Sequence, residues 1–453
     1  MRMLFLFFAG LVQFALMMSG GILAAVHFSP PVLVALSSDA EAEQNLPVVP
    51  DRFFGIASPF VPEQEFMFGF HGGKSSFDFS SDGGSSWSSS SINVADWGDV
   101  KGIAVPMFQD NISLISPVAY HDLGSDAISS SASGWSRRNV STLRVDKRGQ
   151  LTASWDNDMI VTFSGIPSPG INSSVVQANP QRMYGMLRLD SGIYVTAIAI
   201  LWNGLGANPS PDGPIIPWSL VAFSSNDTYH WEYLNVIANI SDFQWSTFGA
   251  TESDISFLSD KRTLICVIRC APAFVRVCAM LLMILQLLSL IQLMLLGRMD
   301  GDANCDTGLY RYFFSALSSD GGLTWSKPIQ MQGLGCVRPK LLLLNDGPLL
   351  LTGGRLCVEN TKDIRLWVSV DGNAHNFSTF SLSYQHNRLW SGDSRFLFDE
   401  LVNNTDAWES LAYTSLVPKS ENSAFIYYNK FFSASWPPWP SATFMMQVQI
   451  TRD

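Results

Sequence analysis

Short runs of apolar residues, each bounded by glycine, proline, asparagine or aspartate, form the main pattern of this chain. Clear examples are Phe66–Phe70, Met183–Leu189, Ile193–Leu201 and Leu220–Phe223. Runs of this length and composition are typical of β-strands, and no long amphipathic helix interrupts them from Phe53 onward. The pattern therefore predicts an all-β fold built from many short strands.

An eight-residue motif, Ser-x-Asp-x-Gly-x-x-Trp, recurs along the chain. Clean copies span Ser80–Trp87 and Ser318–Trp325, a degenerate copy spans Ser224–Trp231, and a fainter copy starts at Ser369, with Phe377 one place late. Ser and Asp can hydrogen-bond the backbone of a tight turn, Gly accepts a positive φ, and Trp anchors the turn on a sheet. Repetition of one such hairpin unit predicts a radial β architecture.

The composition bounds the class of protein. With 453 residues, of which 47% are hydrophobic and 15% charged, the chain can bury a large core and is not of the disordered type. Its net charge of −11 disfavours a nucleic-acid partner, because phosphate binding requires a basic surface. The six cysteines show no metal-type Cys-x-x-Cys spacing, and Cys305, Cys336 and Cys357 could supply one or two disulfides.

Residues 1–25 form the first of two apolar segments. A basic start is followed by the apolar run Leu4–Met18 and by small residues up to Ala25, which is typical of a secretory signal peptide or an uncleaved signal anchor. Export is also indicated by seven Asn-x-Ser/Thr sequons. These begin at Asn111, Asn139, Asn172, Asn226, Asn239, Asn376 and Asn403. We therefore expect a secreted, lumenal or extracellular glycoprotein, with anchoring to a membrane as the alternative.

The second apolar segment, residues 270–298, breaks the strand pattern. Its centre, Val277–Leu296, is twenty residues without a charge, which is long enough to span a bilayer. A span here would place the motifs before and after it on opposite sides of the membrane. We therefore favour a foreign insertion, such as an unspliced intron, that joins Arg269 to Met299; a buried or amphipathic helix and a membrane contact are the alternatives. A transcript that retains the segment would refute the insertion.

The recurring octet resembles the Asp box of sialidases and their propeller relatives. The order of residues from Glu252 through a strand, a Leu-x-Asp turn and a strand ending at Arg269, then Tyr310-Arg311 and the octet at Ser318, is similar to sialidase order. This resemblance implies a six-bladed sialidase-type β-propeller over residues 51–453, interrupted by 270–298, with no metal or organic cofactor. It also implies that the octet aspartates are structural and lie away from the active site.

The resemblance implies a set of site residues. Glu252 would be the carboxylate that activates a catalytic tyrosine, and Arg269 one of three arginines that grip the carboxylate of sialic acid, with Arg298 as a competing placement. The candidate tyrosine is Tyr413, in Leu-Ala-Tyr-Thr-Ser-Leu. A tyrosine hydroxyl, with an ordinary pKa near 10, is a poor nucleophile unless a neighbouring base accepts its proton. Sialidases use tyrosine where most glycosidases use a carboxylate.

The third arginine should follow the stretch Gly335–Arg355, which resembles the fifth blade of the family. Arg355 and Arg365 are both candidates, although neither falls at the family's usual distance before the next strand. Arginine is required at such a position because only guanidinium presents a planar fork to a carboxylate.

The N-terminal half departs most from the family. Arg52 is only a faint counterpart of the first arginine, Asp78 is expected to belong to a strand, and Asp96, Asp99 or Asp212 would be guesses for the acid/base residue. The sequence therefore predicts an exo-sialidase-like glycoside hydrolase acting on terminal sialic or related acidic sugars of a glycan or glycoconjugate. The alternative is a catalytically inactive glycan-binding propeller. The residues leave open the sugar, the linkage, and hydrolysis versus transfer.

Overall fold

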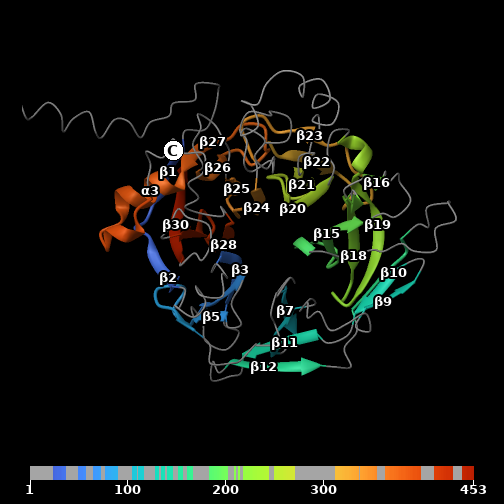
Figure 1. The fold of residues 1–453 in the computed structure, drawn as a ribbon, viewed down its shortest axis with the longest axis horizontal. Helices are drawn as coiled ribbons and strands as arrows, with labels where there is room; N and C mark the ends of the chain where they lie inside the picture. Colours follow the sequence, from blue (N-terminus) through green and yellow to red (C-terminus); the bar gives the residue numbers. More distant parts are fainter. Residues whose placement is uncertain are drawn as a thin grey trace, which may run out of the picture.

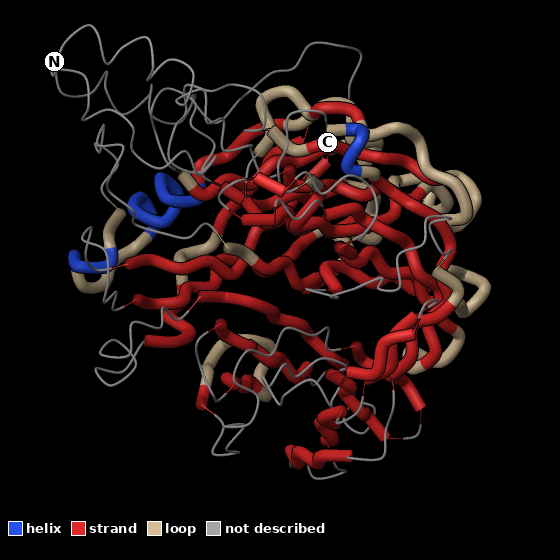
Figure 2. Tube along the Cα trace, turned by 45° about the vertical axis from the view of Figure 1, so that its right-hand side comes forward, coloured by secondary structure: helices blue, strands red, loops and turns tan. Residues whose placement is uncertain are grey.

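Strands dominate the computed structural model of the chain. It describes residues 24–36, 49–57, 65–72, 77–89, 105–109, 111–116, 128–131, 134–137, 140–145, 151–156, 161–166, 183–201, 209–210, 213–214, 218–243, 249–270, 312–335, 337–354, 363–398, 413–431 and 441–452. Helical structure in these ranges comprises α3 (Leu382–Leu389) and the 3-10 turns η3 (Ile240–Asp242) and η5 (Ser394–Phe396). The all-β prediction is thus confirmed. The tube view shows the same predominance of strands (Figure 2).

The strands form separate, mainly antiparallel sheets that follow one another around a ring (Figure 1). The first sheet contains β3 (Val49–Ala57), β4 (Glu65–Gly72), β5 (Phe77–Ser80) and β6 (Ser88–Ser89). The second contains β7 (Val105–Gln109), β8 (Asn111–Ser116), β11 (Val140–Val145) and β12 (Leu151–Asp156). The third contains β14 (Met183–Arg188), β15 (Tyr194–Leu201), β18 (Trp218–Ser225) and β19 (His230–Ala238).

Additional strands extend the third sheet and lie beside it. β13 (Val161–Ser164) pairs in parallel with β19, and β10 (Gly134–Arg137) and β9 (Ile128–Ser131) continue the sheet beyond it. A separate two-stranded ribbon is made by β16 (Pro209–Ser210) and β17 (Gly213–Pro214).

The C-terminal half of the chain forms the remaining sheets. The fourth contains β20 (Ala250–Phe257), β21 (Leu264–Cys270), β22 (Phe314–Ser318) and β23 (Ile329–Gln330). The fifth contains β24 (Val337–Leu343), β25 (Leu349–Gly354), β26 (Ile364–Ser369) and β27 (Ser378–Ser381). The last contains β28 (Ser415–Ser420), β29 (Ser423–Phe431), β30 (Ser441–Arg452), β1 (Ala24–Phe28) and β2 (Val32–Leu36).

Strands from both ends of the chain make the last sheet. β1 pairs with β30 in the register Ala24↔Arg452, and β2 pairs with the same strand in the register Val32↔Met445. Residues before position 51, where the sequence places the start of the propeller, therefore contribute to the sheets. Ala24 and Ala25 of β1 also fall inside the segment 1–25 that the sequence predicts to be a signal. This pairing joins the chain ends and closes the ring.

The first strands of successive sheets line the middle of the ring. β14 contacts β20, β20 contacts β24, β24 contacts β28, and β28 contacts β3. Side chains of β20, β24 and the residues next to β28 can therefore meet although they are far apart in sequence. Among the described residues no helix is long and apolar enough to cross a membrane, and the apolar segments 1–23 and 271–298 lie outside those residues.

The clean octets form the hydrogen-bonded turns that their residues suggest. In Ser318–Trp325, the Asp320 carboxylate accepts bonds from Ser318 Oγ at 2.8 Å and from Thr324 N at 2.9 Å, and Trp325 Nε1 donates to Gly322 O at 3.0 Å. In the copy at Ser80–Trp87, Asp82 accepts the corresponding bonds from Ser80 Oγ and Ser86 N, and Trp87 Nε1 donates to Gly84 O. These hydrogen bonds hold the pKa of both aspartates below the ordinary value, against the opposing effect of partial desolvation.

The two degenerate copies fold into similar turns with local changes. In the third sheet the turn begins at Ser225, one residue later than the sequence motif suggests, and Thr228 takes the positive φ of 68°. At Ser369 the hydroxyl donates to Asp371, while Gly372 (φ 68°) and Ala374 (φ 62°) adopt the left-handed conformation. In all four sheets that carry one, the octet connects the third strand to the fourth.

The octet turns also fasten neighbouring sheets. A Cβ at Gly322 would meet Val195 of the third sheet at 3.3 Å, and the backbone oxygen of Gly372 accepts from Ser259 N of the fourth sheet at 3.0 Å. Trp87 of the first sheet packs edge-on against Tyr427 of the last, with ring centroids 5.8 Å apart. Each of these contacts reaches from one sheet to its neighbour on the ring, so the turns set the packing of the sheets.

Candidate functional site

Glu252 lies near the start of β20, on the inner side of the fourth sheet. The β20–β21 register is irregular between Ala250 and Ser253, so the ladder is interrupted at Glu252. Such irregularities re-aim a side chain and are common next to active sites. The residue is 7% exposed. A carboxylate this deeply buried requires charged or hydrogen-bonding partners.

Three groups surround the Glu252 carboxylate. Arg269, at the far end of β21, places Nη1 2.6 Å from Oε2, and the backbone N–H of Arg338 donates to the same oxygen at 3.0 Å. The hydroxyl of Tyr413 donates to the other oxygen, Oε1, at 3.1 Å. The carboxylate is thus held on both oxygens, by residues of the fourth sheet, the fifth sheet and the start of the last.

Tyr413 stands two residues before β28 and contacts two charged groups. Besides its hydrogen bond to Glu252, its ring lies under the guanidinium of Arg338, whose Cζ is 5.1 Å from the ring centroid. Thr414, the next residue, is fully buried and shares a 2.7 Å hydrogen bond with Thr352 of β25. This contact fixes the backbone that carries the tyrosine.

The structure brings together three of the residues named from the sequence. Tyr413 and Glu252 are 161 residues apart and in direct contact, and Arg269 is paired with the same carboxylate. Arg269 is therefore engaged with Glu252 through a 2.6 Å ion pair. The catalytic and binding roles of these residues stay predictions.

The other arginine candidates are placed differently. Arg365 lies on β26, the third strand of the fifth sheet, with Nε 3.4 Å from Asp363 Oδ2. Burial raises the pKa of Asp363, although the nearby Arg365 acts in the opposite direction. The structure therefore shows Arg365 paired with Asp363 and not with the Glu252 group. Arg355 and Arg298 lie outside the described residues.

The three aspartates that the sequence offers for the acid/base role, Asp96, Asp99 and Asp212, lie outside the described residues. Asp78 belongs to β5, as expected, and is 1% exposed. Three further aspartates, Asp82, Asp320 and Asp371, belong to octet turns. Related positions lie outside the described residues or have no described side chain: Arg52, Tyr310 and Arg311.

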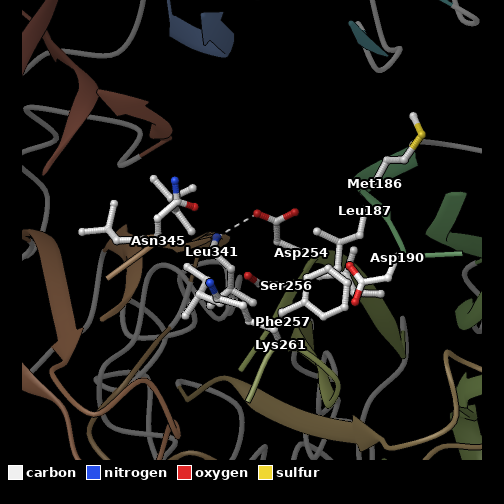
Figure 3. A pocket seen from close by; sticks show the side chains of 13 residues that line it. Met186, Leu187, Asp190, Asp254, Ser256, Phe257, Lys261, Leu341 and Asn345 are labelled. Atoms are coloured by element: carbon white, nitrogen blue, oxygen red, sulfur yellow. Dashed lines mark hydrogen bonds between the residues drawn. The ribbon is translucent and has the colours of Figure 1, made fainter. Parts of the chain in front are cut away.

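A cavity of about 380 Å³ lies further along the same strands. It is lined by residues of β14, β20 and β24, with Asp190 and Lys261 at its edge (Figure 3). Asp254, two positions after Glu252, points toward it, and its Oδ2 accepts a 2.8 Å bond from Leu341 N. Glu252 and Tyr413 are not among the residues that line it.

The cysteines and metal-type residues give no second centre in the described part of the chain. Cys266 and Cys270 are free and buried, and burial raises the pKa of both thiols well above the ordinary value. No group of three or more His, Cys, Asp or Glu among the described residues could hold a metal ion. The proposed disulfide cysteines Cys305, Cys336 and Cys357 lie outside these residues.

Sequence reasoning missed Arg338. The residue belongs to the stretch compared with the fifth blade, but no role was assigned to it there. Its signal was weak: an arginine followed by proline at the start of an apolar strand. Only the folded chain shows that its backbone and its side chain reach Glu252 and Tyr413.

Comparisons with known proteins bear on the fold. No protein-family model and no curated protein matches the chain. A protein of unknown function from Dyadobacter fermentans has a similar structure, with a TM-score of 0.51 and 14% identity over 94% of this chain and 99% of that one. The GH93 α-L-arabinofuranosidase of Fusarium graminearum gives a TM-score of 0.47 and 11% identity over 92% of this chain and 97% of the enzyme.

A third structure is more distant. The α-L-arabinofuranosidase from Lactobacillus brevis gives a TM-score of 0.34 and 10% identity, over 72% of this chain and 87% of that one. At these identities the similarity concerns architecture alone. The Dyadobacter fermentans structure matches almost end to end, so the chain has the fold of that protein.

Proposed function

We propose that this protein is an exo-acting glycoside hydrolase of the sialidase type, which cleaves terminal sialic or related acidic sugars. The observation that carries the proposal is the 3.1 Å contact between Tyr413 Oη and Glu252 Oε1 inside the ring of sheets. Tyr413 is the nucleophile and Glu252 the base in this proposal. The pair comes from separate sheets and is 161 residues apart, so local sequence does not explain their meeting.

The chemistry of the pair suits an anionic sugar. A carboxylate nucleophile would repel the carboxylate of such a substrate, whereas a neutral tyrosine does not. As Tyr413 Oη bonds to the anomeric carbon, its proton passes to Glu252 and the glycosidic C–O bond breaks. The leaving oxygen takes a proton from a carboxylic acid or from solvent. Water then attacks the anomeric carbon and gives up one proton to the carboxylate or solvent that had protonated the leaving oxygen, the bond from the carbon to Tyr413 Oη breaks, and Glu252 returns its proton to the tyrosine.

The charges around the pair support this assignment. Arg269, Arg338 and Glu252 together carry a formal charge of +1, which a phenolate or a bound carboxylate would balance. Guanidinium offers five N–H donors, and one of those on Arg269 is directed to Glu252. In the proposal Arg269 also contacts the substrate carboxylate. Arg355 is a further candidate for that contact, and Arg365 is a weaker one because it is paired with Asp363.

A six-bladed propeller is the architecture proposed for this site. Its support is the ring of sheets with four or more strands, closed by pairing of β1 and β2 with β30. Further support comes from the octets, which join the third and fourth strands of their sheets in the manner expected of Asp boxes. First strands would then converge on the site from several blades, as β20, β24 and the residue before β28 do.

We also keep a second candidate, a glycan-binding propeller without hydrolytic activity. It is favoured by one observation: both oxygens of Glu252 already accept hydrogen bonds, two of them from arginines. A carboxylate bound in this way is stabilised as the anion and is a weaker base. In that case the group would be a structural clamp that holds three sheets together.

Turnover of a fluorogenic sialoside by the full-length chain tests the proposal. Tyr413→Phe and Glu252→Gln should each reduce kcat by roughly 10²-fold or more. The matched control is Tyr427→Phe, another buried tyrosine, whose hydroxyl is 3.7 Å from Met67 Sδ. This control should keep the parent rate.

The outcomes separate the candidates. If the parent releases no more product than Tyr413→Phe, the hydrolase proposal is rejected, and retained binding to immobilised sialoglycans then favours the glycan-binding candidate. Turnover of neutral fluorogenic glycosides with no turnover of sialosides would overturn the choice of acidic sugars while keeping a glycosidase.

Export of the chain belongs to the same proposal. The sequon asparagines Asn226 and Asn376 lie in octet turns and are exposed, so an oligosaccharide could be attached there without disturbing the core. Expression in a eukaryotic secretory system should give a product whose mass falls on treatment with an N-glycosidase. Recovery of the product only inside the cell and without glycans would contradict export.

A further inference from the structure

Arg338 combines features that a purely structural arginine does not need. It is the second residue of β24, is 2% exposed, and contacts both members of the proposed catalytic pair. Here the backbone serves Glu252 and the side chain serves Tyr413, so one residue connects the fifth sheet to the fourth and the last.

The backbone at Arg338 is strained. Its φ is +34°, within the left-handed region that favours glycine, and the next residue is Pro339, which normally requires an extended conformation before it. The β24–β25 register shifts between Val337 and Lys340, so the ladder is interrupted here. Such strain persists only when the surroundings compensate it, and it clusters at functional sites.

The interruption gives the backbone N–H of Arg338 a different partner. Instead of continuing the strand ladder, it donates to Glu252 Oε2 at 3.0 Å, across 86 residues of sequence. A neutral donor fixes the carboxylate without adding a side chain that could move. The strained conformation therefore has an identifiable benefit: the orientation of Glu252 toward Tyr413.

The guanidinium acts on the other member of the pair. Its Cζ lies 5.1 Å from the centroid of the Tyr413 ring. A cation at this distance stabilises a neutral tyrosine ring modestly, through cation–π attraction. It stabilises an anionic phenolate much more strongly, because two full charges then attract each other. Among the described residues, the charged groups in contact with Tyr413 include Arg338 of β24 and Glu252 of β20, with Arg269 of β21 on the far oxygen of Glu252.

We propose that Arg338 is a positioning residue of the catalytic site: its backbone N–H orients Glu252, and its guanidinium stabilises the negative charge that develops on Tyr413 as its proton passes to Glu252. This inference rests on the proposed function and deepens it. Arg338 need not touch the sugar. Its effect should appear mainly in kcat and in the pH dependence of the reaction, with a smaller change in KM.

The test uses side-chain variants of the full-length protein, because each keeps the backbone N–H. Arg338→Met removes the charge and retains much of the length, and Arg338→Lys retains a cation. The expected result for Arg338→Met is a fall of about 10-fold or more in kcat, and a shift of the acid limb of the kcat/KM profile to higher pH by about one unit. Arg338→Lys should show a smaller fall in kcat and a smaller shift of the acid limb than Arg338→Met.

Two controls make the result specific. Arg395→Met removes an exposed guanidinium that lies 4.9 Å from the ring of the buried Phe396 in η5, and it should leave rate and pH profile unchanged. A second readout does not depend on turnover: the tyrosinate absorbance near 295 nm, titrated against pH and corrected with Tyr413→Phe. Its Tyr413 component should move to higher pH in Arg338→Met if that variant retains the far-ultraviolet circular dichroism of the parent.

These readouts distinguish the two proposals. An active parent whose pH profile and tyrosinate titration are unchanged by Arg338→Met would overturn the role of Arg338 and leave the hydrolase proposal intact. An inactive parent whose titration still shifts would reject the hydrolase and keep the electrostatic coupling of Arg338 to Tyr413. If Arg338→Met does not fold, Arg338→Lys decides the question. A Lys variant with the parent's pH profile supports the inference, whereas a Lys variant that folds like the parent but has no activity contradicts a role for the positive charge of Arg338.

Discussion

Replacement of Gly185 by alanine should strongly destabilise the protein, because this glycine allows two inner strands to approach. Gly185 lies on β14, and a Cβ there would overlap Asp254 Oδ1 and lie 2.9 Å from Ile255 N and 3.0 Å from Ile255 Cγ2, all on β20. Asp254 cannot turn away freely, because its other oxygen accepts the 2.8 Å bond from Leu341 N on β24. The substitution therefore acts on three sheets together.

The magnitude follows from the two ways in which the clash can be relieved. Separation of β14 from β20 is overpacking, which costs about 1–3 kcal/mol. Rotation of the Asp254 carboxylate sacrifices a hydrogen bond between a charged acceptor and a buried N–H, which costs about 1.5–3 kcal/mol. We expect Gly185→Ala to lower the free energy of unfolding by about 2–3 kcal/mol. Urea denaturation followed by tryptophan fluorescence measures the change.

A double-mutant cycle tests the stated cause. Asp254→Ala removes the clashing oxygen, so Gly185→Ala should be less destabilising in that background by about 1 kcal/mol. The relief is partial because the contacts with Ile255 remain. If the two substitutions add within about 0.5 kcal/mol, the clash with Asp254 is not the cause and the reasoning is refuted.

Three further predictions concern pH, chain closure and thiols. Desolvation alone would raise the pKa of Asp227, but hydrogen bonds from His230 and from backbone N–H groups outweigh it and lower the pKa to about 2. The ionised Asp227 therefore stabilises the folded protein fully above the pKa of an unfolded aspartate, near 4, and this contribution is lost as the pH falls toward 2. Since the Asp227 side chain is about half exposed (47%), Asp227→Asn should lower the free energy of unfolding by only about 1 kcal/mol at pH 6, and by about half as much at pH 3. A difference in urea midpoints between parent and variant that stays constant with pH would contradict this. Deletion through residue 36 should lower the Tm far more than deletion through residue 23, because only the first removes β1 and β2 from β30; equal melting curves would show that this pairing does not close the ring. Cys266 and Cys270 should resist iodoacetamide in the native state and react after unfolding, as peptide mass spectrometry can show, and modification of either in the native state would contradict their burial.

The parts of the fold that could be predicted from sequence are those set by near neighbours. The octets at Ser80 and Ser318 specify their turns because donor, acceptor and glycine all fall within eight residues. The copy near Ser224 shows the limit of this reasoning. Thr228 takes a positive φ, so the turn closes from Ser225 with one residue fewer than the motif suggests.

The site was predictable only in part. Order along the chain, read through the resemblance to sialidases, singled out Glu252, Arg269 and Tyr413. The same comparison offered Arg365, but the short sequence distance to Asp363 provides it with a local partner. Arg338 was missed because its two contacts depend on a strained backbone and on neighbours 86 and 75 residues away (Glu252 and Tyr413), neither of which local patterning encodes.

The sequence by itself determined that the chain forms short strands joined by octet turns, because strand and turn preferences arise from residues that are adjacent along the chain. Only the tertiary structure decided that Glu252 would be bound by Arg269, Arg338 and Tyr413, and that β1 and β2 would complete the last sheet. The physical reason is distance in sequence. Contacts between separate sheets depend on how the sheets pack around the ring, and that packing is a property of the whole chain.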